Sequence, residues 1–84
     1  SREITYPQSA TENGIMGTVN VIFTIDKNGK TSNYHINQPL GYGLDEESIR
    51  VVKLLADNWL PGLLNGQAVD IEYVQPVYYK LIDN

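Results

Sequence analysis

The sequence predicts a small α+β domain, a two-layer sandwich with a three-stranded antiparallel sheet and two helices on one face. Three observations predict this fold class: an alternating apolar pattern near residue 20, a second one near the end of the chain, and a helical segment between them. A crossover through that helix returns parallel to the strand that it left. Every strand pair is therefore antiparallel if the first strand lies between the other two, which gives the order 2-1-3.

Length and composition limit the possible functions. The 84 residues form one domain at most, and the hydrophobic share of 42% is ordinary for a globular fold. A net charge of −4 with six scattered Lys and Arg residues disfavours nucleic acid and acidic membrane surfaces, because binding would begin with repulsion. The chain has no cysteine, no signal peptide and no bilayer-spanning apolar run. Since it begins abruptly at "SREITYP", we expect a fragment or processed form of a longer protein.

Local patterns predict the first helix and the first strand. "YPQSATENG" (residues 6–14) predicts a helix of one or two turns with Ala10 facing inward, because proline suits the first turn and Asn-Gly the end. In "GTVNVIFTID" (residues 17–26) apolar residues alternate with polar ones, with Ile22 as the exception, which predicts a strand. Its inward side chains are Val19, Val21, Phe23 and Ile25.

The second strand follows a tight reversal. "DKNGK" predicts a turn in which Gly29 adopts the left-handed conformation. "TSNYHIN" then predicts a strand with Tyr34 and Ile36 facing inward. Residues 37–43 hold one proline and two glycines, which predicts a loop.

"GLDEESIRVVKLLADNW" (residues 43–59) predicts the main helix. Three acidic residues in its first turn suit the helix dipole, which explains them better than acid–base catalysis does. Its expected apolar stripe consists of Leu44, Val51 or Val52, Leu55 and Trp59. "LPG" ends the helix, "LLNGQ" is a turn, and the final strand begins near Ala68. We expect Trp59 to fix the helix end onto the sheet rather than to form a ligand platform.

Pro76 stands in the middle of the last strand, residues 69–81, although proline has no N–H for a neighbouring strand. An edge strand tolerates it, because only one of its sides is paired. Backbone and side-chain directions alternate with the same two-residue period, so Pro76 should lie where its missing N–H points outward. The residues that share this direction are Asp70, Glu72, Val74, Tyr78 and Lys80. A bulge near Gln75 would change this parity, and the sequence leaves that alternative open.

A free edge of this kind can accept an extended peptide by strand addition. Pro76, Glu72 and Lys80 blunt the edge in part, whereas Val74 and Tyr78 leave it attractive. About four to six backbone hydrogen bonds at roughly 0.5–1.5 kcal/mol each, less the cost of ordering the peptide, predict an affinity on the order of micromolar.

Enzyme patterns are missing from the sequence. His35 is the only histidine and lies on the polar face of a short strand, no Gly-x-Ser-x-Gly elbow occurs, and there is no cysteine nucleophile. Metal-ligand spacing is absent, and residues 41–43 lack the third glycine of a phosphate-binding loop. We therefore predict no catalysis, no cofactor and no metal.

Five segments resemble the C-terminal domain of TonB-family energy transducer proteins, in a Bacteroidetes-like form. They are "YPQSA", "GIMGTVNVIFTIDKNGK", "GLDEESIRVV", "NWLPG" and "NGQAVDIEYVQPVYYKL". Each segment is loose alone, but together they cover residues 6–81 in the expected order and spacing. The resemblance implies a single TonB C-terminal-like domain over residues 1–84, in which residues 1–5 are a residual linker.

The resemblance also implies a function. It implies a periplasmic domain whose parent protein is anchored in the inner membrane and couples a proton-driven motor complex there to outer-membrane TonB-dependent receptors. The receptor's TonB box would pair with the last edge strand, and force transmitted through it would drive nutrient uptake. A homodimer through the edge strands is possible in such a fold. The receptor and its cargo do not follow from the sequence.

The resemblance and the edge argument together give a set of partner-binding residues. They are Val74, Gln75, Pro76, Val77, Tyr78, Lys80, Tyr6 and Pro7. For Tyr6 and Pro7, receptor contact and helix initiation are equally supported. Tyr79 should belong to the core.

Leu63 and Leu64 depart from the polar residues that relatives usually carry after the "WxPG" motif. We expect them to be partly buried, the alternative being an exposed patch for a dimer or a partner. The alternative function is a C-terminal anchoring or sensory domain of an envelope protein or membrane sensor peptidase, without a receptor ligand.

Overall fold

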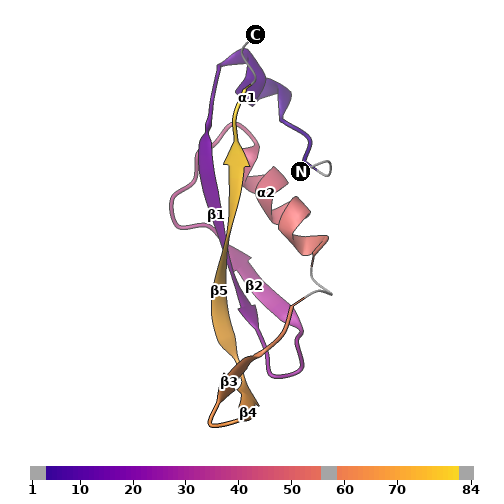
Figure 1. Ribbon diagram of the computed structural model, residues 1–84. Coiled ribbons are helices and arrows are strands. Elements are labelled where there is room, and N and C mark those ends of the chain that lie inside the picture. The colour runs from indigo at the N-terminus through magenta and orange to yellow at the C-terminus, as the bar shows by residue number, and fades with distance from the viewer. Residues whose placement is uncertain (1–3, 56–58, 82–84) are drawn as a thin grey trace.

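The computed structural model describes residues 4–55 and 59–81. Its elements in chain order are α1 (Gln8–Glu12), β1 (Gly17–Ile25), β2 (Thr31–His35), α2 (Leu44–Lys53), β3 (Gly62–Leu64), β4 (Gln67–Val69) and β5 (Ile71–Tyr79). The molecule is elongated, with principal extents of 50 × 24 × 17 Å, and the long strands β1 and β5 run along it (Figure 1).

The main sheet has the strand order β2-β1-β5, and both pairs are antiparallel. The predicted order 2-1-3 is therefore confirmed, with β5 as the last long strand. β1 and β5 pair without interruption over nine positions, from Gly17 opposite Tyr79 to Ile25 opposite Ile71. This continuous register excludes the bulge near Gln75 that the sequence had left open.

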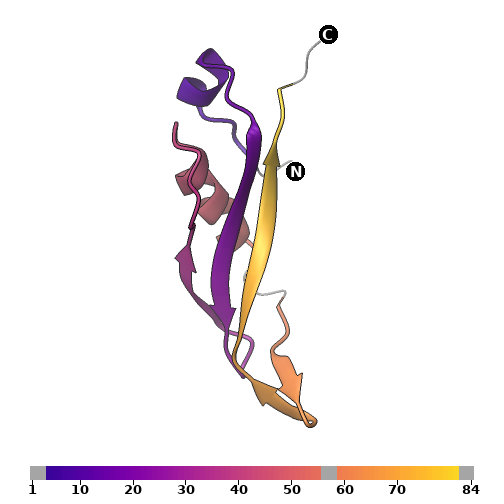
Figure 2. The ribbon, with the colours of Figure 1, turned by 90° about the vertical axis from the view of Figure 1, so that its left-hand side faces the viewer.

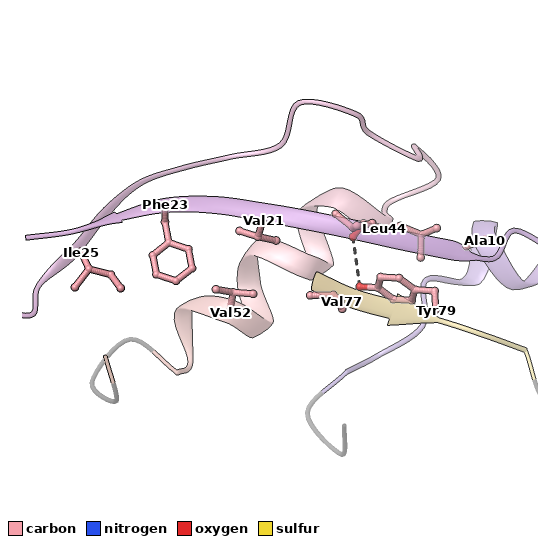
Figure 3. Packing of buried hydrophobic residues seen from close by; sticks show 9 residues of the cluster. Ala10, Val21, Phe23, Ile25, Leu44, Val52, Val77 and Tyr79 are labelled. Atoms are coloured by element: carbon pink, nitrogen blue, oxygen red, sulfur yellow. Dashed lines mark hydrogen bonds between the residues drawn. The ribbon is translucent and has the colours of Figure 1, made fainter. Parts of the chain in front are cut away.

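Both helices cover one face of the sheet, and the core lies between them and the strands (Figure 2). The predicted alternation in β1 is confirmed, because Val19, Val21, Phe23 and Ile25 are all buried. The other elements contribute Ala10, Leu44, Val52, Val77 and Tyr79 to the same cluster (Figure 3). Since apolar burial is worth roughly 1.5–3 kcal/mol for each large side chain, this cluster supplies most of the stability of a chain so short.

The predicted first helix and first turn are also confirmed. The carbonyl of Pro7 accepts the N–H groups of Ala10 and Thr11, both at 3.1 Å, and so begins α1. In the turn after β1, the carboxylate of Asp26 accepts the N–H of Asn28 and that of Lys30. Gly29 has a φ of 82°, the left-handed conformation that this turn requires.

α2 ends at Lys53, so the prediction that it continues to Trp59 is wrong in extent. The N–H groups of Leu54 and Leu55 bond to carbonyls three residues back, which tightens the chain at the helix end. The apolar stripe stops there, because Leu55 is 40% exposed. Trp59 lies outside the helix, although it packs on the sheet as predicted, with its ring centroid 5.1 Å from that of Phe23. The predicted helical residues 56–58 lie outside the described ranges.

A second, two-stranded sheet was not predicted. β3 and β4 form a hairpin whose turn, Asn65-Gly66, has positive φ at both residues, 53° and 79°. The predicted turn in "LLNGQ" is therefore confirmed, but it joins two strands. The predicted last strand is divided, because Asp70 separates β4 from β5. Asn-Gly between two apolar segments is the typical sequence of such a hairpin.

Candidate functional site

β5 offers the longest free edge of the main sheet. It pairs with β1 on one side, and within residues 4–55 and 59–81 no strand lies on its other side. β2, at the opposite edge, has only five residues and an irregular register with β1. The expected position of the last strand at an edge is therefore confirmed.

Pro76 lies opposite Asn20 in an unbroken ladder. Positions in an antiparallel pair alternate between hydrogen-bonded and non-hydrogen-bonded, and a proline keeps the ladder intact only at the second kind. We infer that the even-numbered residues of β5 direct their backbone groups away from β1. The free edge then carries the N–H and C=O groups of Glu72, Val74 and Tyr78.

The side chains of β5 alternate as this register requires. Tyr78 is 70% exposed, and Val74 is also exposed, on the face of the sheet that the helices leave open. Val77 and Tyr79 are buried against the helices. Lys80 is exposed just beyond the end of β5. The predicted site residues that belong to β5 thus point to both faces of the sheet.

The side chain of Gln75 occupies a backbone hydrogen-bond acceptor of the edge at Pro76. Its side-chain amide donates a hydrogen bond of 3.0 Å to the carbonyl of Pro76. Because Pro76 has no N–H and its carbonyl already has a partner, this position offers a neighbouring strand fewer backbone groups than Val74 or Tyr78.

Tyr6 and Pro7 lie at one end of β5 rather than on its edge. The ring of Tyr6 packs edge-on against that of Tyr79, with the centroids 5.4 Å apart, and its hydroxyl donates to the carbonyl of Ile15. Pro7 begins α1. Helix initiation and packing are therefore established for these two residues, and their contact with a partner stays a prediction.

The segment before Tyr6 is fastened to α2. The N–H of Thr5 donates to the carboxylate of Glu47 at 2.7 Å, and Ile4 packs against the core. Glu47 also accepts two hydrogen bonds from Arg50, at 2.7 and 2.8 Å. The bond from Arg50 is the main reason that the pKa of Glu47 is lowered, burial of the carboxylate acting in the opposite direction. The division of the chain into a linker, residues 1–5, and a domain stays a prediction.

Tyr79, at the end of β5, is buried in the core. Its hydroxyl lies 3.0 Å from that of Ser48. It also lies 3.4 Å from the carbonyl of Leu44 (Figure 3). Burial raises the pKa of Tyr79, in spite of the bond with Ser48. The prediction that Tyr79 belongs to the core is confirmed.

A groove of about 290 Å³ runs beside the free edge. Its lining consists of Ile4, Val51, Val52, Leu55, Gln75, Pro76, Val77 and Tyr78. No side chain in this lining is charged. Sequence reasoning missed the groove, because a helix continued to Trp59 would have placed further turns beside Leu55.

Leu63 and Leu64 are 73% and 62% exposed, so the expectation of partial burial is wrong. The residue before them, Gly62, lies close to Ile71 of the main sheet. The alternative of an exposed position is therefore confirmed, and a dimer or partner contact through these leucines stays a prediction.

In the described part of the chain, no three His, Asp or Glu side chains come together as around a metal ion. Neither helix there has the length and apolarity of a membrane span.

The fold and the site define a class of domain: a small α+β sandwich with both helices on one face and a long terminal strand, one edge of which no described strand covers. A family model described as Gram-negative bacterial TonB protein C-terminal matches residues 2–81. The chain therefore belongs to the family of TonB C-terminal domains.

One solved structure agrees with this assignment. The solution NMR structure of the Pseudomonas aeruginosa TonB CTD is 23% identical in sequence and superposes with a TM-score of 0.57. The match covers 96% of this chain and 81% of that one, and at this identity it shows a shared fold. No curated protein sequence matches the chain significantly.

Proposed function

We propose that this domain is the periplasmic peptide-binding module of a TonB-type energy transducer. In this proposal the β5 edge pairs with the TonB box of an outer-membrane TonB-dependent receptor. The observation that carries the proposal is the free edge of β5, which is nine residues long and, among the described strands, is paired with β1 alone. An extended segment can add to such an edge through backbone hydrogen bonds, while side chains on the two faces select its sequence.

The residues of the edge would share this work. Val74 and Tyr78 would bond the peptide through their backbone and contact its side chains on the open face. Gln75 and Val77 would face the peptide on the helix side, and Lys80 would lie at one end of the paired segment. Tyr6 and Pro7, near that end through Tyr79, would flank the peptide.

Force transmission belongs to the same proposal. A peptide paired with β5 would lie along the long axis of the molecule (Figure 1). A pull along that axis would load its backbone hydrogen bonds together rather than one after another. The parent protein, anchored in the inner membrane, would receive the force from the proton-driven motor complex there.

A titration tests the proposal. The ¹⁵N-labelled domain is mixed with synthetic peptides that carry the TonB boxes of the host's receptors. We expect amide shifts concentrated in residues 71–80 and a dissociation constant on the order of micromolar. The controls are two forms of the same peptide, one with prolines at the odd positions and one with prolines at the even positions, so that one of them lacks the N–H donors that point to β5. Unchanged spectra at millimolar peptide, or undiminished binding of both controls, would contradict the proposal.

A further inference from the structure

The apolar groove beside β5 is continuous with the free edge. Gln75, Pro76 and Val77 line it from the strand, Val51 lines it from α2, and Leu55 lines it from the turn after α2. Ile4 closes it from the N-terminal segment. A chain that pairs with β5 would therefore border the groove along its length.

The geometry of strand addition determines which side chains of a bound peptide would enter the groove. Neighbouring strands lie about 4.8 Å apart, and directly opposite residues project their side chains to the same face. A peptide residue opposite Gln75 or Val77 would project toward α2, as Val77 does. The residues on either side of it would project to the open face, beside Val74 and Tyr78.

We infer that this groove is a side-chain subsite that selects an apolar residue in the extended segment bound by β5. This inference rests on the proposed function. The occupant is an aliphatic or aromatic side chain, because the lining holds no charged group and a charged side chain would lose hydration there without gaining a partner. The volume of about 290 Å³ suffices, since an aliphatic cavity of about 150 Å³ takes up benzene.

Two features explain why the peptide would be selected through a side chain near Pro76. The backbone at Pro76 has no N–H to offer, and the side chain of Gln75 bonds its carbonyl. Side-chain contact can supply there what the backbone does not. Leu55, 40% exposed at the end of α2, lies at the rim, where an incoming side chain would cover it.

Adjacent leucines provide a matched pair of variants. Leu54 and Leu55 are both exposed and both follow the last turn of α2, but only Leu55 lines the groove. Neither Leu54→Ser nor Leu55→Ser removes a fully buried side chain, so both variants should keep the fold. The amide spectrum of each variant, unchanged away from residues 50–60, checks this.

The probes are two capped heptapeptides, one of alternating Thr and Val and one with every Val replaced by Ser. Both can pair with β5 through their backbone. Amide shifts of residues 71–80 report binding to the edge, and their titration gives the dissociation constant. We expect the Val peptide to bind roughly three- to tenfold more tightly to the unmodified domain. In Leu55→Ser this preference should fall below about twofold, whereas Leu54→Ser should keep it.

The outcomes separate this inference from the proposed function. Equal binding of the two peptides at the β5 edge, or an equal loss of preference in both leucine variants, overturns the subsite and leaves the edge. Absence of shifts in residues 71–80 with both heptapeptides and with the TonB-box peptides overturns the proposed function and the subsite together.

Discussion

Glu47 joins two parts of the chain that are distant in sequence. Its carboxylate accepts the N–H of Thr5 and forms an ion pair with Arg50. These bonds favour the ionised carboxylate, so the pKa of Glu47 in the folded protein lies below its ordinary value of 4.5. The contribution of this carboxylate to the free energy of unfolding is present above its ordinary pKa of 4.5 and is lost as the pH falls through the lower pKa of the folded protein.

Replacement of this carboxylate should therefore have a pH-dependent effect. We expect Glu47→Gln to lower the free energy of unfolding by about 1 kcal/mol near pH 7, and the difference from the unmodified domain to shrink toward pH 3. Urea unfolding at a series of pH values measures this. Glu46→Gln is the control, since Glu46 is exposed in the same helical turn. An equal loss at pH 3 and pH 7 would contradict the assignment.

The β3–β4 hairpin contacts the main sheet through a glycine. A Cβ atom at Gly62 would lie 2.2 Å from Cγ2 of Ile71, so even alanine does not fit without movement. We expect Gly62→Ala to cost about 1–3 kcal/mol of stability, because overpacking forces side chains or backbone to shift. Thermal or urea unfolding gives the value.

A double variant identifies the cause of that loss. Ile71→Ala removes Cγ2, so Gly62→Ala should cost much less in its presence than alone. Additive losses would show that the close approach of Gly62 to Ile71 is not the reason.

The backbone direction of β5 can be tested by proline substitution. If Tyr78 directs its N–H away from β1, Tyr78→Pro should cost less than about 1.5 kcal/mol of stability and should weaken peptide binding at least about fivefold. Val77→Pro is the control, because it would remove a bond of the β1–β5 ladder and clash within the core, at a cost of about 3 kcal/mol or more. Normal peptide binding by Tyr78→Pro would reverse the assigned parity.

Strong periodic patterns made the main elements predictable from the sequence. The alternation in residues 17–25 and 71–79 follows from a sheet buried on one face, and Pro76 indicated an edge strand. The end of α2 was not predictable from periodicity, because Leu54 and Leu55 continue the apolar pattern although both are exposed. Because Leu55 lines the groove from the turn after α2, the groove could not be predicted without the end of the helix.

At the scale of the whole molecule, the domain is built around one long antiparallel pair. β1 and β5 run along the long axis of the molecule, and the helices cover one face of the sheet (Figures 1 and 2). Within the described residues, the edge of β5 that points away from β1 has no neighbouring strand. A chain of this size buries a smaller share of its surface than a larger domain does, so its stability margin is thin.

The most direct test of the central claim is amide hydrogen exchange along β5. Without peptide, we expect the N–H groups of Val74 and Tyr78 to exchange at least about tenfold faster than those of Gln75, Val77 and Tyr79, because only the second set bonds to β1. With a TonB-box peptide bound, the fast set should become protected. Uniformly slow exchange of both sets in the free domain would show that the edge already has a partner, and would contradict the claim.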